Sequence, residues 1–265
     1  MGERDPYSRV GYRKLIAWPE RIRREWPLIG EVLATGPSRR VVELGCGPGQ
    51  HARSLAEAGF EVVGVDRSAA MIADATAEPP PAGLRFVLGD VTEVDRLVDG
   101  TFGAALCLGN TLPHLADEER LDAFAASLAR TLEPGAPLLL QILNYDRIHD
   151  RRVRFLPVSF RPLEDEAEGE LVFLRLMDPQ PDGCVRFYPS TLVLTPGEDP
   201  PLRLEQSREV HLRGWRRREV EAALEAHDIH PERALGGFDG SPFDAGESPD
   251  LVLVARRADD RPRRG

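Results

Sequence analysis

One short stretch, residues 41–51, constrains the fold of this chain more than any other. It reads Val-Val-Glu-Leu-Gly-Cys-Gly-Pro-Gly-Gln-His, an apolar run that ends in three closely spaced glycines. Glycine tolerates left-handed backbone conformations and lets a ligand approach the main chain closely. We therefore predict a buried strand that turns sharply into a helix beginning near His51. The free N–H groups of that helix would point at a ligand on the glycine loop.

Two further apolar runs end in acidic residues. Residues 61–65 lead into Asp66, and residues 84–88 lead into Gly89-Asp90-Val91. An acid placed like Asp66 is able to accept hydrogen bonds from both hydroxyls of a ribose. A glycine turn followed by an acid is also typical of dinucleotide-binding enzymes, but their spacing is G-x-G-x-x-G, which this loop lacks. The glycine spacing of this loop therefore argues against a dinucleotide ligand.

From residue 41 onward, apolar runs alternate with helical patterns, which is typical of α/β proteins. We predict a Rossmann-like, seven-stranded, mainly parallel sheet with helices on both faces, plus an antiparallel β insertion. Loops at the carboxyl ends of parallel strands line the ligand crevice in such folds. The segments that fall at this edge are Gly45–Gly49, Asp66, Asp90, Asn110–His114 and Asn144–Asp146.

Changes of pattern divide the chain into four parts. Residues 1–40 read as a helical cap interrupted at its prolines, Pro19 and Pro27. Residues 41–152 and 211–258 form the predicted core, and residues 259–265 a charged, flexible tail. Residues 153–210 carry short β-rich runs and are predicted to cover the cleft or to form a subunit contact, which would make the protein a homo-oligomer. Within the cap, the residues best placed to close the cleft are Tyr7, Tyr12, Arg13 and Trp18.

Composition excludes several classes of partner. A net charge of −10 repels a phosphate backbone, so we expect no nucleic-acid partner, and we interpret the short arginine clusters, such as residues 21–24, as solvated helix faces. The three cysteines and six histidines lack the spacing of a metal or disulfide framework, which favours a metal-free protein in a reducing cytoplasm. No apolar run is long enough to cross a bilayer, so we expect no membrane partner.

The motif Glu-Leu-Gly-Cys-Gly-Pro-Gly, together with the acids at the next two strand ends, resembles the class I S-adenosylmethionine-dependent methyltransferases. The resemblance implies that the glycine loop holds the methionine end of S-adenosylmethionine and that Asp66 holds the ribose. It also implies that Asp90 accepts from the adenine amino group while Val91 packs on the ring. The implied cofactor site consists of Glu43, Gly45, Cys46, Gly47, Gly49, Asp66, Arg67, Met71, Asp90, Val91, Leu108 and Gly109.

A narrower resemblance involves the run Cys-Leu-Gly-Asn-Thr-Leu-Pro-His-Leu at residues 107–115, followed by Asn-Tyr-Asp at residues 144–146. Both runs are similar to those of glycine and sarcosine N-methyltransferases, as are the β-rich insertion and residues 235–243. The resemblance implies that Asn110, His114 and Tyr145 are the catalytic residues and surround the methyl acceptor.

One position departs from the glycine N-methyltransferase pattern. Those enzymes carry an arginine that grips the substrate carboxylate immediately before the Asn-Tyr-Asp run, and this chain has Leu143. Leucine cannot pair with a carboxylate. Glycine is therefore not the expected substrate unless an arginine from another segment, Arg13, Arg161 or Arg175, replaces the missing clamp.

Methyl transfer from a sulfonium is an in-line displacement with an excellent leaving group, so positioning dominates catalysis. An amine acceptor must arrive neutral and needs only water to take its proton afterwards, whereas a hydroxyl acceptor requires a base, for which His114 is the candidate. We predict a methyltransferase acting on a small molecule at nitrogen, with S-adenosylhomocysteine as the other product. The alternatives are an O-methyltransferase of a sugar or natural product, a nicotinamide oxidoreductase, and a non-catalytic protein that binds S-adenosylmethionine.

Overall fold

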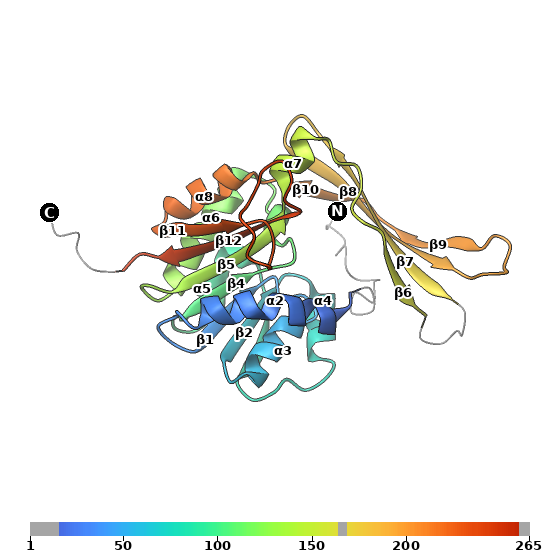
Figure 1. Cartoon of the computed structure of the whole chain (residues 1–265). Coiled ribbons are helices and arrows are strands. Elements are labelled where there is room, and N and C mark those ends of the chain that lie inside the picture. Colours follow the sequence, from blue (N-terminus) through green and yellow to red (C-terminus); the bar gives the residue numbers. More distant parts are fainter. Residues whose placement is uncertain (1–15, 164–168, 260–265) are drawn as a thin grey trace.

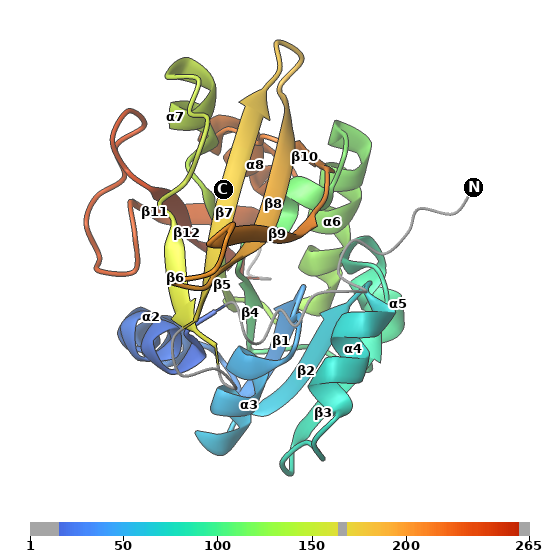
Figure 2. The same cartoon turned by 90° about the vertical axis from the view of Figure 1, so that its right-hand side faces the viewer.

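The computed structural model describes residues 16–163 and 169–259. A layered α/β core is joined to an antiparallel sheet that projects from one end of it (Figure 1). The view turned by 90° places this second sheet in front of the core, beyond the carboxyl ends of the parallel strands (Figure 2). The strand ends that were expected to bind a ligand therefore lie between the two parts.

The core sheet confirms the predicted seven-stranded, mainly parallel architecture, with strand order β11-β12-β5-β4-β1-β2-β3. Strand β12 runs antiparallel to both of its neighbours, β11 and β5, and the other pairings of this sheet are parallel. The central strands are buried on both faces, as expected of parallel strands covered by helices. The strands are β1 (Arg40–Leu44), β2 (Glu61–Asp66), β3 (Leu84–Leu88), β4 (Ala104–Cys107), β5 (Pro137–Leu143), β11 (Ile229–Leu235) and β12 (Asp250–Arg257).

Helices cover both faces of the sheet, as predicted. The apolar sides of α2 (Trp18–Leu33) and α3 (Gln50–Glu57) pack on one face. The opposite face is covered by α5 (Val94–Leu97), α6 (Glu118–Thr131) and α8 (Arg217–Glu225). The remaining short elements lie near strand ends: η1 (Val91–Glu93), α4 (Ala69–Thr76), η2 (Leu112–His114) and α7 (Tyr145–Asp150).

Helix α2 differs from the expected cap. Pro19 lies in its first turn, where proline is tolerated, but the helix continues through Pro27, which was expected to interrupt it. Burial of Leu28, Ile29 and Val32 against the sheet stabilises the helix beyond the proline. Three of the proposed cap residues, Tyr7, Tyr12 and Arg13, lie outside the described residues.

The predicted antiparallel insertion is confirmed as a five-stranded sheet in the order β10-β8-β7-β6, with β9 paired to β8. Its strands are β6 (Ser159–Pro162), β7 (Glu170–Pro179), β8 (Cys184–Leu194), β9 (Leu202–Ser207) and β10 (Val210–Arg213). The sheet thus extends past residue 210, the expected boundary of the insertion. One face buries Met177, Val185 and Leu212 in the main core, whereas Phe160 and Leu204 remain exposed.

Strand β11 and helix α7 were not predicted from the sequence. Strand β11 has the sequence Ile-His-Pro-Glu-Arg-Ala-Leu, whose alternation is broken by a register shift between Pro231 and Arg233. Helix α7 begins directly after β5, where a loop was expected, because Asn144 caps its first turn. In the described parts of the chain, no helix is long and apolar enough to span a membrane.

Candidate active site

A cavity of about 290 Å³ lies at the carboxyl ends of the parallel strands. It is lined by residues from β1, β2, the Asp90 turn and the loop after β4, as the topology predicted. Every candidate cofactor residue except Gly49 lines this cavity, and so do Asn110 and His114. The lining residues that were not proposed as ligands are Arg21, Pro48, His51, Ser68, Thr111, Leu115 and Arg120, and Trp18 joins them from the cap.

The glycine loop has the predicted strand-turn-helix geometry. Gly45, Gly47 and Gly49 all have positive φ angles, of 72°, 53° and 76°. A Cβ on Gly45 would lie 2.3 Å from the Thr111 side chain, and one on Gly49 would lie 2.4 Å from the Phe86 ring. A Cβ on Gly47 would meet nothing within 4 Å. Gly45 and Gly49 are therefore required for packing, whereas the space beside Gly47 is open to a ligand.

Asp66 and Asp90 present ordered carboxylates to the cavity. Asp66 Oδ2 accepts from the Gly47 N–H and Oδ1 from the Ser68 N–H, each at 2.8 Å. Asp90 Oδ1 accepts from the Thr92 N–H and hydroxyl, and Oδ2 accepts from Arg120 at 2.5 Å. Burial alone would raise the pKa of Asp90, but these bonds outweigh it and lower the pKa. Both carboxylates are thus held in fixed orientations at the cavity.

A buried chain of charges lies behind the glycine loop and was not anticipated. His51 is 5% exposed, and its two carboxylate neighbours, Glu25 on α2 and Glu43 on β1, are each 2% exposed. His51 Nε2 lies 2.8 Å from Glu25 Oε2, and Nδ1 lies 3.5 Å from Glu43 Oε1. Arg21 Nε donates to Glu25 Oε1 at 2.9 Å. The Arg21 side chain is only 16% exposed, so the interpretation of residues 21–24 as a solvated face was wrong for this residue.

Neighbouring charges set the ionisation of His51 and Glu25 in this buried cluster. Burial lowers the pKa of His51, but hydrogen bonds that the ring donates to Glu25 and Glu43 outweigh burial and raise it. Burial likewise opposes ionisation of Glu25, yet His51 and Arg21 lower the pKa of that carboxyl. Glu43 Oε2 is buried and has no hydrogen-bond partner within the described residues. The cavity wall therefore carries one carboxylate oxygen that the protein itself leaves unsatisfied.

The loop after β4 holds Asn110 in a fixed orientation. Gly109 and Asn110 have φ angles of 73° and 66°, a region that asparagine tolerates better than most residues. Asn110 Oδ1 accepts from the Leu143 N–H, and Nδ2 donates to the Tyr145 hydroxyl, both at 3.0 Å. Tyr145 is 1% exposed and does not line the cavity. The structure therefore brings Asn110 and Tyr145 together, with Asn110 between Tyr145 and the cavity.

His114 lines the cavity in a different electrostatic setting. Burial, together with the positive charges of Arg67 and Arg208, lowers the pKa of His114 to about 4. Arg67 also lines the cavity, whereas Arg208 comes from the connection between β9 and β10. His114 is therefore neutral near pH 7.

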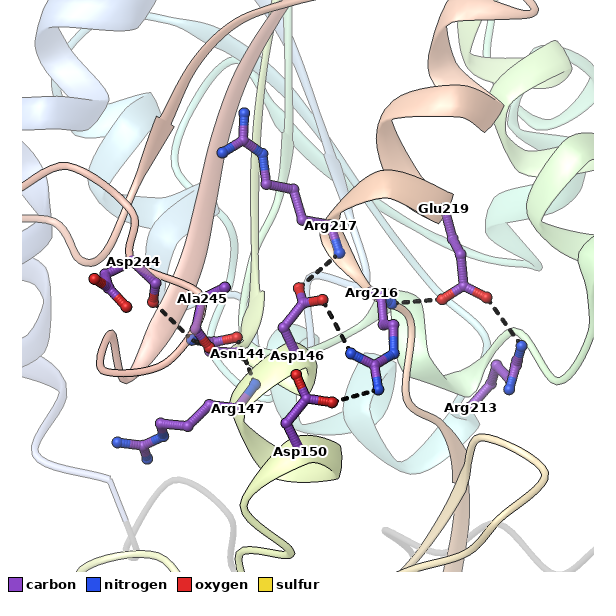
Figure 3. Close-up of polar contacts among 10 residues, drawn as sticks. All are labelled: Asn144, Asp146, Arg147, Asp150, Arg213, Arg216, Arg217, Glu219, Asp244 and Ala245. Atoms are coloured by element: carbon purple, nitrogen blue, oxygen red, sulfur yellow. Dashed lines mark hydrogen bonds and ion pairs between the residues drawn. The ribbon is translucent and has the colours of Figure 1, made fainter.

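The polar residues of the Asn-Tyr-Asp run anchor α7 and do not line the cavity, contrary to expectation (Figure 3). Asn144 is fully buried; its Oδ1 accepts from the Arg147 N–H, and its Nδ2 donates to the carbonyls of Asp244 and Ala245. Asp146 accepts from Arg216 at 3.3 Å and from the Arg217 N–H at 3.0 Å. These side chains are used to fix α7 against α8 and the loop at residues 244–248.

Metal ligation has no support in the described parts of the chain, where no group of three or more His, Cys, Asp or Glu residues is placed to hold an ion. Cys46 lines the cavity beside Glu43 and Asp66, and burial together with these two carboxylates raises the pKa of its thiol. The chemistry of the cavity therefore rests on carboxylates, guanidinium groups, imidazoles and glycine main chain.

Comparison with known proteins agrees with this geometry. Residues 41–135 match the model of a methyltransferase domain. The chain is 35% identical over 138 residues to a glycine/sarcosine N-methyltransferase of Halorhodospira halochloris, covering 51% of this chain and 52% of that protein. It is 34% identical to the glycine/sarcosine N-methyltransferase of Aphanothece halophytica, covering 52% of each. The chain thus aligns with about half the length of these relatives.

Solved structures match nearly the whole chain. The CcbJ methyltransferase from Streptomyces caelestis has a TM-score of 0.72 and 26% identity, covering 96% of this chain and 97% of that one. CalS10, an amino pentose methyltransferase from Micromonospora echinaspora solved with bound S-adenosylmethionine, has a TM-score of 0.71 and 23% identity, covering 93% and 94%. The core and the antiparallel insertion therefore form one arrangement that these two solved methyltransferases share.

Proposed function

We propose that this chain, whose residues 41–135 form a methyltransferase domain, transfers a methyl group from S-adenosylmethionine to a nitrogen atom of a small molecule. The observation that carries the proposal is the convergence of the glycine loop, Asp66 and Asp90 on one cavity, each from the end of a different strand. A sulfonium cofactor supplies an activated methyl group when bound. The protein then has to orient the acceptor and exclude competing geometries.

The residues present fit S-adenosylmethionine. The ordered carboxylates of Asp66 and Asp90 suit the ribose hydroxyls and the adenine amino group, respectively. The open space beside Gly47 leaves room for the ligand where a Cβ would intrude. Glu43 Oε2, buried without a partner in the described chain, suits the α-ammonium group, and Arg21, which lines the same wall, suits the α-carboxylate.

The acceptor side of the cavity favours an amine over a hydroxyl. A general base works best when its pKa lies near the working pH, and the pKa of about 4 makes His114 a weak base at neutrality. A neutral amine needs no such base. The N-methyltransferase activity named for the Halorhodospira and Aphanothece relatives supports the same choice.

The carboxylate clamp of glycine N-methyltransferases is missing at residue 143, where this chain has Leu143. Of the three arginines expected as replacements, Arg13 lies outside the described residues, and Arg161 and Arg175 do not line the cavity. Both donate instead to backbone carbonyls of the insertion, Arg161 to Phe160 and Arg175 to Pro157. We expect an acceptor whose amine is recognised without a carboxylate clamp at residue 143.

The insertion is proposed to complete the cleft. Its inner face packs on the core through Met177 and Val185, and Arg208 is close enough to His114 to influence its ionisation. Association into a homo-oligomer through the insertion stays a prediction, and light scattering during size-exclusion chromatography tests it directly.

A panel of amines and hydroxyl compounds, incubated with S-adenosylmethionine and read by mass spectrometry, tests the function. Gain of one methyl group at nitrogen is the expected result. Methylation at oxygen would favour the sugar or natural-product alternative. Cofactor binding by calorimetry without product from any acceptor would instead indicate a non-catalytic binding protein. Oxidation of a reduced nicotinamide cofactor, followed by absorbance, would overturn the assignment, and robust sarcosine formation would contradict the exclusion of glycine.

A further inference from the structure

His51 is a buried histidine that lies between two buried carboxylates behind the glycine loop. It lies in the first turn of α3, between Glu43 of the strand that precedes the loop and Glu25 of α2. One ring nitrogen faces a carboxylate oxygen at 2.8 Å and the other faces a second carboxylate oxygen at 3.5 Å. Because ionised carboxylates only accept hydrogen bonds, protons on both ring nitrogens let the ring serve both neighbours. The geometry therefore calls for an imidazolium.

Other charged groups around this histidine complete a nearly balanced cluster. Glu25 is also paired with Arg21 at 2.9 Å and with Arg24 at 3.5 Å, both from α2. From β12, Asp250 accepts from Gln141, and burial together with the charge of Glu25 raises its pKa. Arg21 further lies 5.1 Å over the Trp18 ring, which meets His51 edge-on at 5.7 Å. Glu25 therefore has charged partners on both carboxylate oxygens. It holds His51 in place from the side opposite to β1.

Glu43 is the unsatisfied member of the cluster. Its Oε1 faces His51 Nδ1, whereas its Oε2 has no hydrogen-bond partner in the described chain although the residue is 2% exposed. A buried carboxylate oxygen without a donor is unfavourable, and a cationic ligand group relieves the penalty. Since Glu43 and His51 both line the cavity, a ligand bound there is placed to supply that group.

We propose that His51 is a positioning residue for the cofactor: braced by Glu25, its imidazolium holds Oε1 of Glu43, so that Oε2 binds the α-ammonium group of S-adenosylmethionine. This inference rests on the proposed function, because it requires that cofactor in the cavity. It also assigns a role to α2, which carries the brace. The N-terminal cap thereby contributes to cofactor affinity through its charges as well as through its packing.

Two ligands separate this role from a general structural one. S-adenosylhomocysteine contains the α-ammonium group, whereas 5′-methylthioadenosine contains the adenosine but lacks the amino-acid part. Calorimetry with both is performed on the unsubstituted protein and on His51→Gln. We expect His51→Gln to weaken S-adenosylhomocysteine binding by about tenfold and to leave 5′-methylthioadenosine within about twofold, because only the first ligand uses Glu43.

A double-mutant cycle tests whether His51 acts through Glu43. In a Glu43→Gln background, we expect His51→Gln to cause no further loss of S-adenosylhomocysteine affinity, since coupled residues are not additive. His227 pairs with Asp122 at 2.7 Å away from the cavity, so His227→Gln is a matched control that should change neither ligand. If His51→Gln does not fold, Glu25→Gln decides the matter, with a smaller loss confined to S-adenosylhomocysteine.

The results that overturn the inference are distinct from those that overturn the function. Equal weakening of both ligands, or losses that add fully in the double variant, would show that His51 only stabilises the loop. Lack of S-adenosylhomocysteine binding by the unsubstituted protein would overturn the proposed function and this inference with it.

Discussion

Two histidines line the same cavity in opposite electrostatic surroundings. His51, behind the glycine loop, lies between two buried carboxylates, and His114, after β4, lies near Arg67 and Arg208. Burial lowers the pKa of both imidazoles, but the carboxylates reverse the shift at His51 while the arginines reinforce it at His114. The neighbours rather than the depth of burial decide whether each ring is charged.

This difference matches the two halves of the proposed reaction. A cationic His51 orients a carboxylate toward the zwitterionic end of the cofactor. On the acceptor side, the positive charges of Arg67 and Arg208 that help to keep His114 neutral would also favour the unprotonated form of an amine. One side of the cavity is therefore organised for charge recognition, whereas the charges on the other side disfavour protonation of a neighbouring base.

The largest expected effect is on cofactor affinity, which should depend on Asp66 on one side of the cavity and not on His114 on the other. Asp66→Ala removes the proposed ribose acceptor and the carboxylate that fixes Gly47 and Ser68, so we expect cofactor binding to weaken by about 3 kcal/mol, or roughly a hundredfold. His114→Gln on the other side should leave the affinity nearly unchanged. Calorimetry with S-adenosylhomocysteine measures both, and a similar loss in the two variants would erase the distinction.

A second effect concerns stability in acid. The folded-state pKa of His114, about 4, lies below the usual value of 6.5, so the unfolded chain binds a proton that the folded chain refuses. Between pH 6.5 and 4 this residue therefore costs stability as pH falls. We expect the free energy of unfolding of His114→Gln to rise relative to that of the unsubstituted protein by up to about 2 kcal/mol as pH falls across that range. Urea unfolding measures it. If the difference in unfolding free energy between the two proteins stays constant from pH 6.5 to 4, the His114 ring is already protonated in the folded state over that range.

His51 should show the opposite dependence. Its folded-state pKa is raised, so its contribution is fully present below about pH 6.5 and is lost as pH rises through the folded-state value. The advantage of the unsubstituted protein over His51→Gln, on the order of 1 kcal/mol, should therefore shrink in alkaline solution. Unfolding curves at three pH values measure it, and an advantage that grows with pH would show that His51 is neutral in the folded state.

Local requirements made much of this cavity predictable. A positive φ at Gly45 and an acid at the end of β2 are properties of a few adjacent residues, so they are visible in the sequence. The Glu25–His51 pair joins residues 26 apart, and nothing in either segment indicates the other. Such pairing depends on how α2 packs on the sheet, and a run of arginines at residues 21–24 reads as solvent-facing until that packing is known.

The anchor of α7 was missed for a related reason. Asn144 follows a strand end, where a polar residue is typical of a ligand site, yet its amide caps a helix and binds the loop at residues 244–248. A cap and a ligand contact require the same residue type at the same place. Only the partner on the distant loop distinguishes them, and that partner is about a hundred residues away.

The smallest expected effect is on turnover and concerns only His114, on the proposed acceptor side of the cavity. If the acceptor is an amine, His114→Gln should reduce turnover by less than about tenfold, since removing a general base costs roughly a hundredfold or more. The rate in both proteins should rise with pH as the amine loses its proton, with no inflection near pH 4 that disappears in the variant. Steady-state rates from pH 4 to 9 with one amine acceptor make the measurement. A hundredfold loss, together with disappearance of an inflection near pH 4, would establish His114 as a base and shift the assignment toward a hydroxyl acceptor.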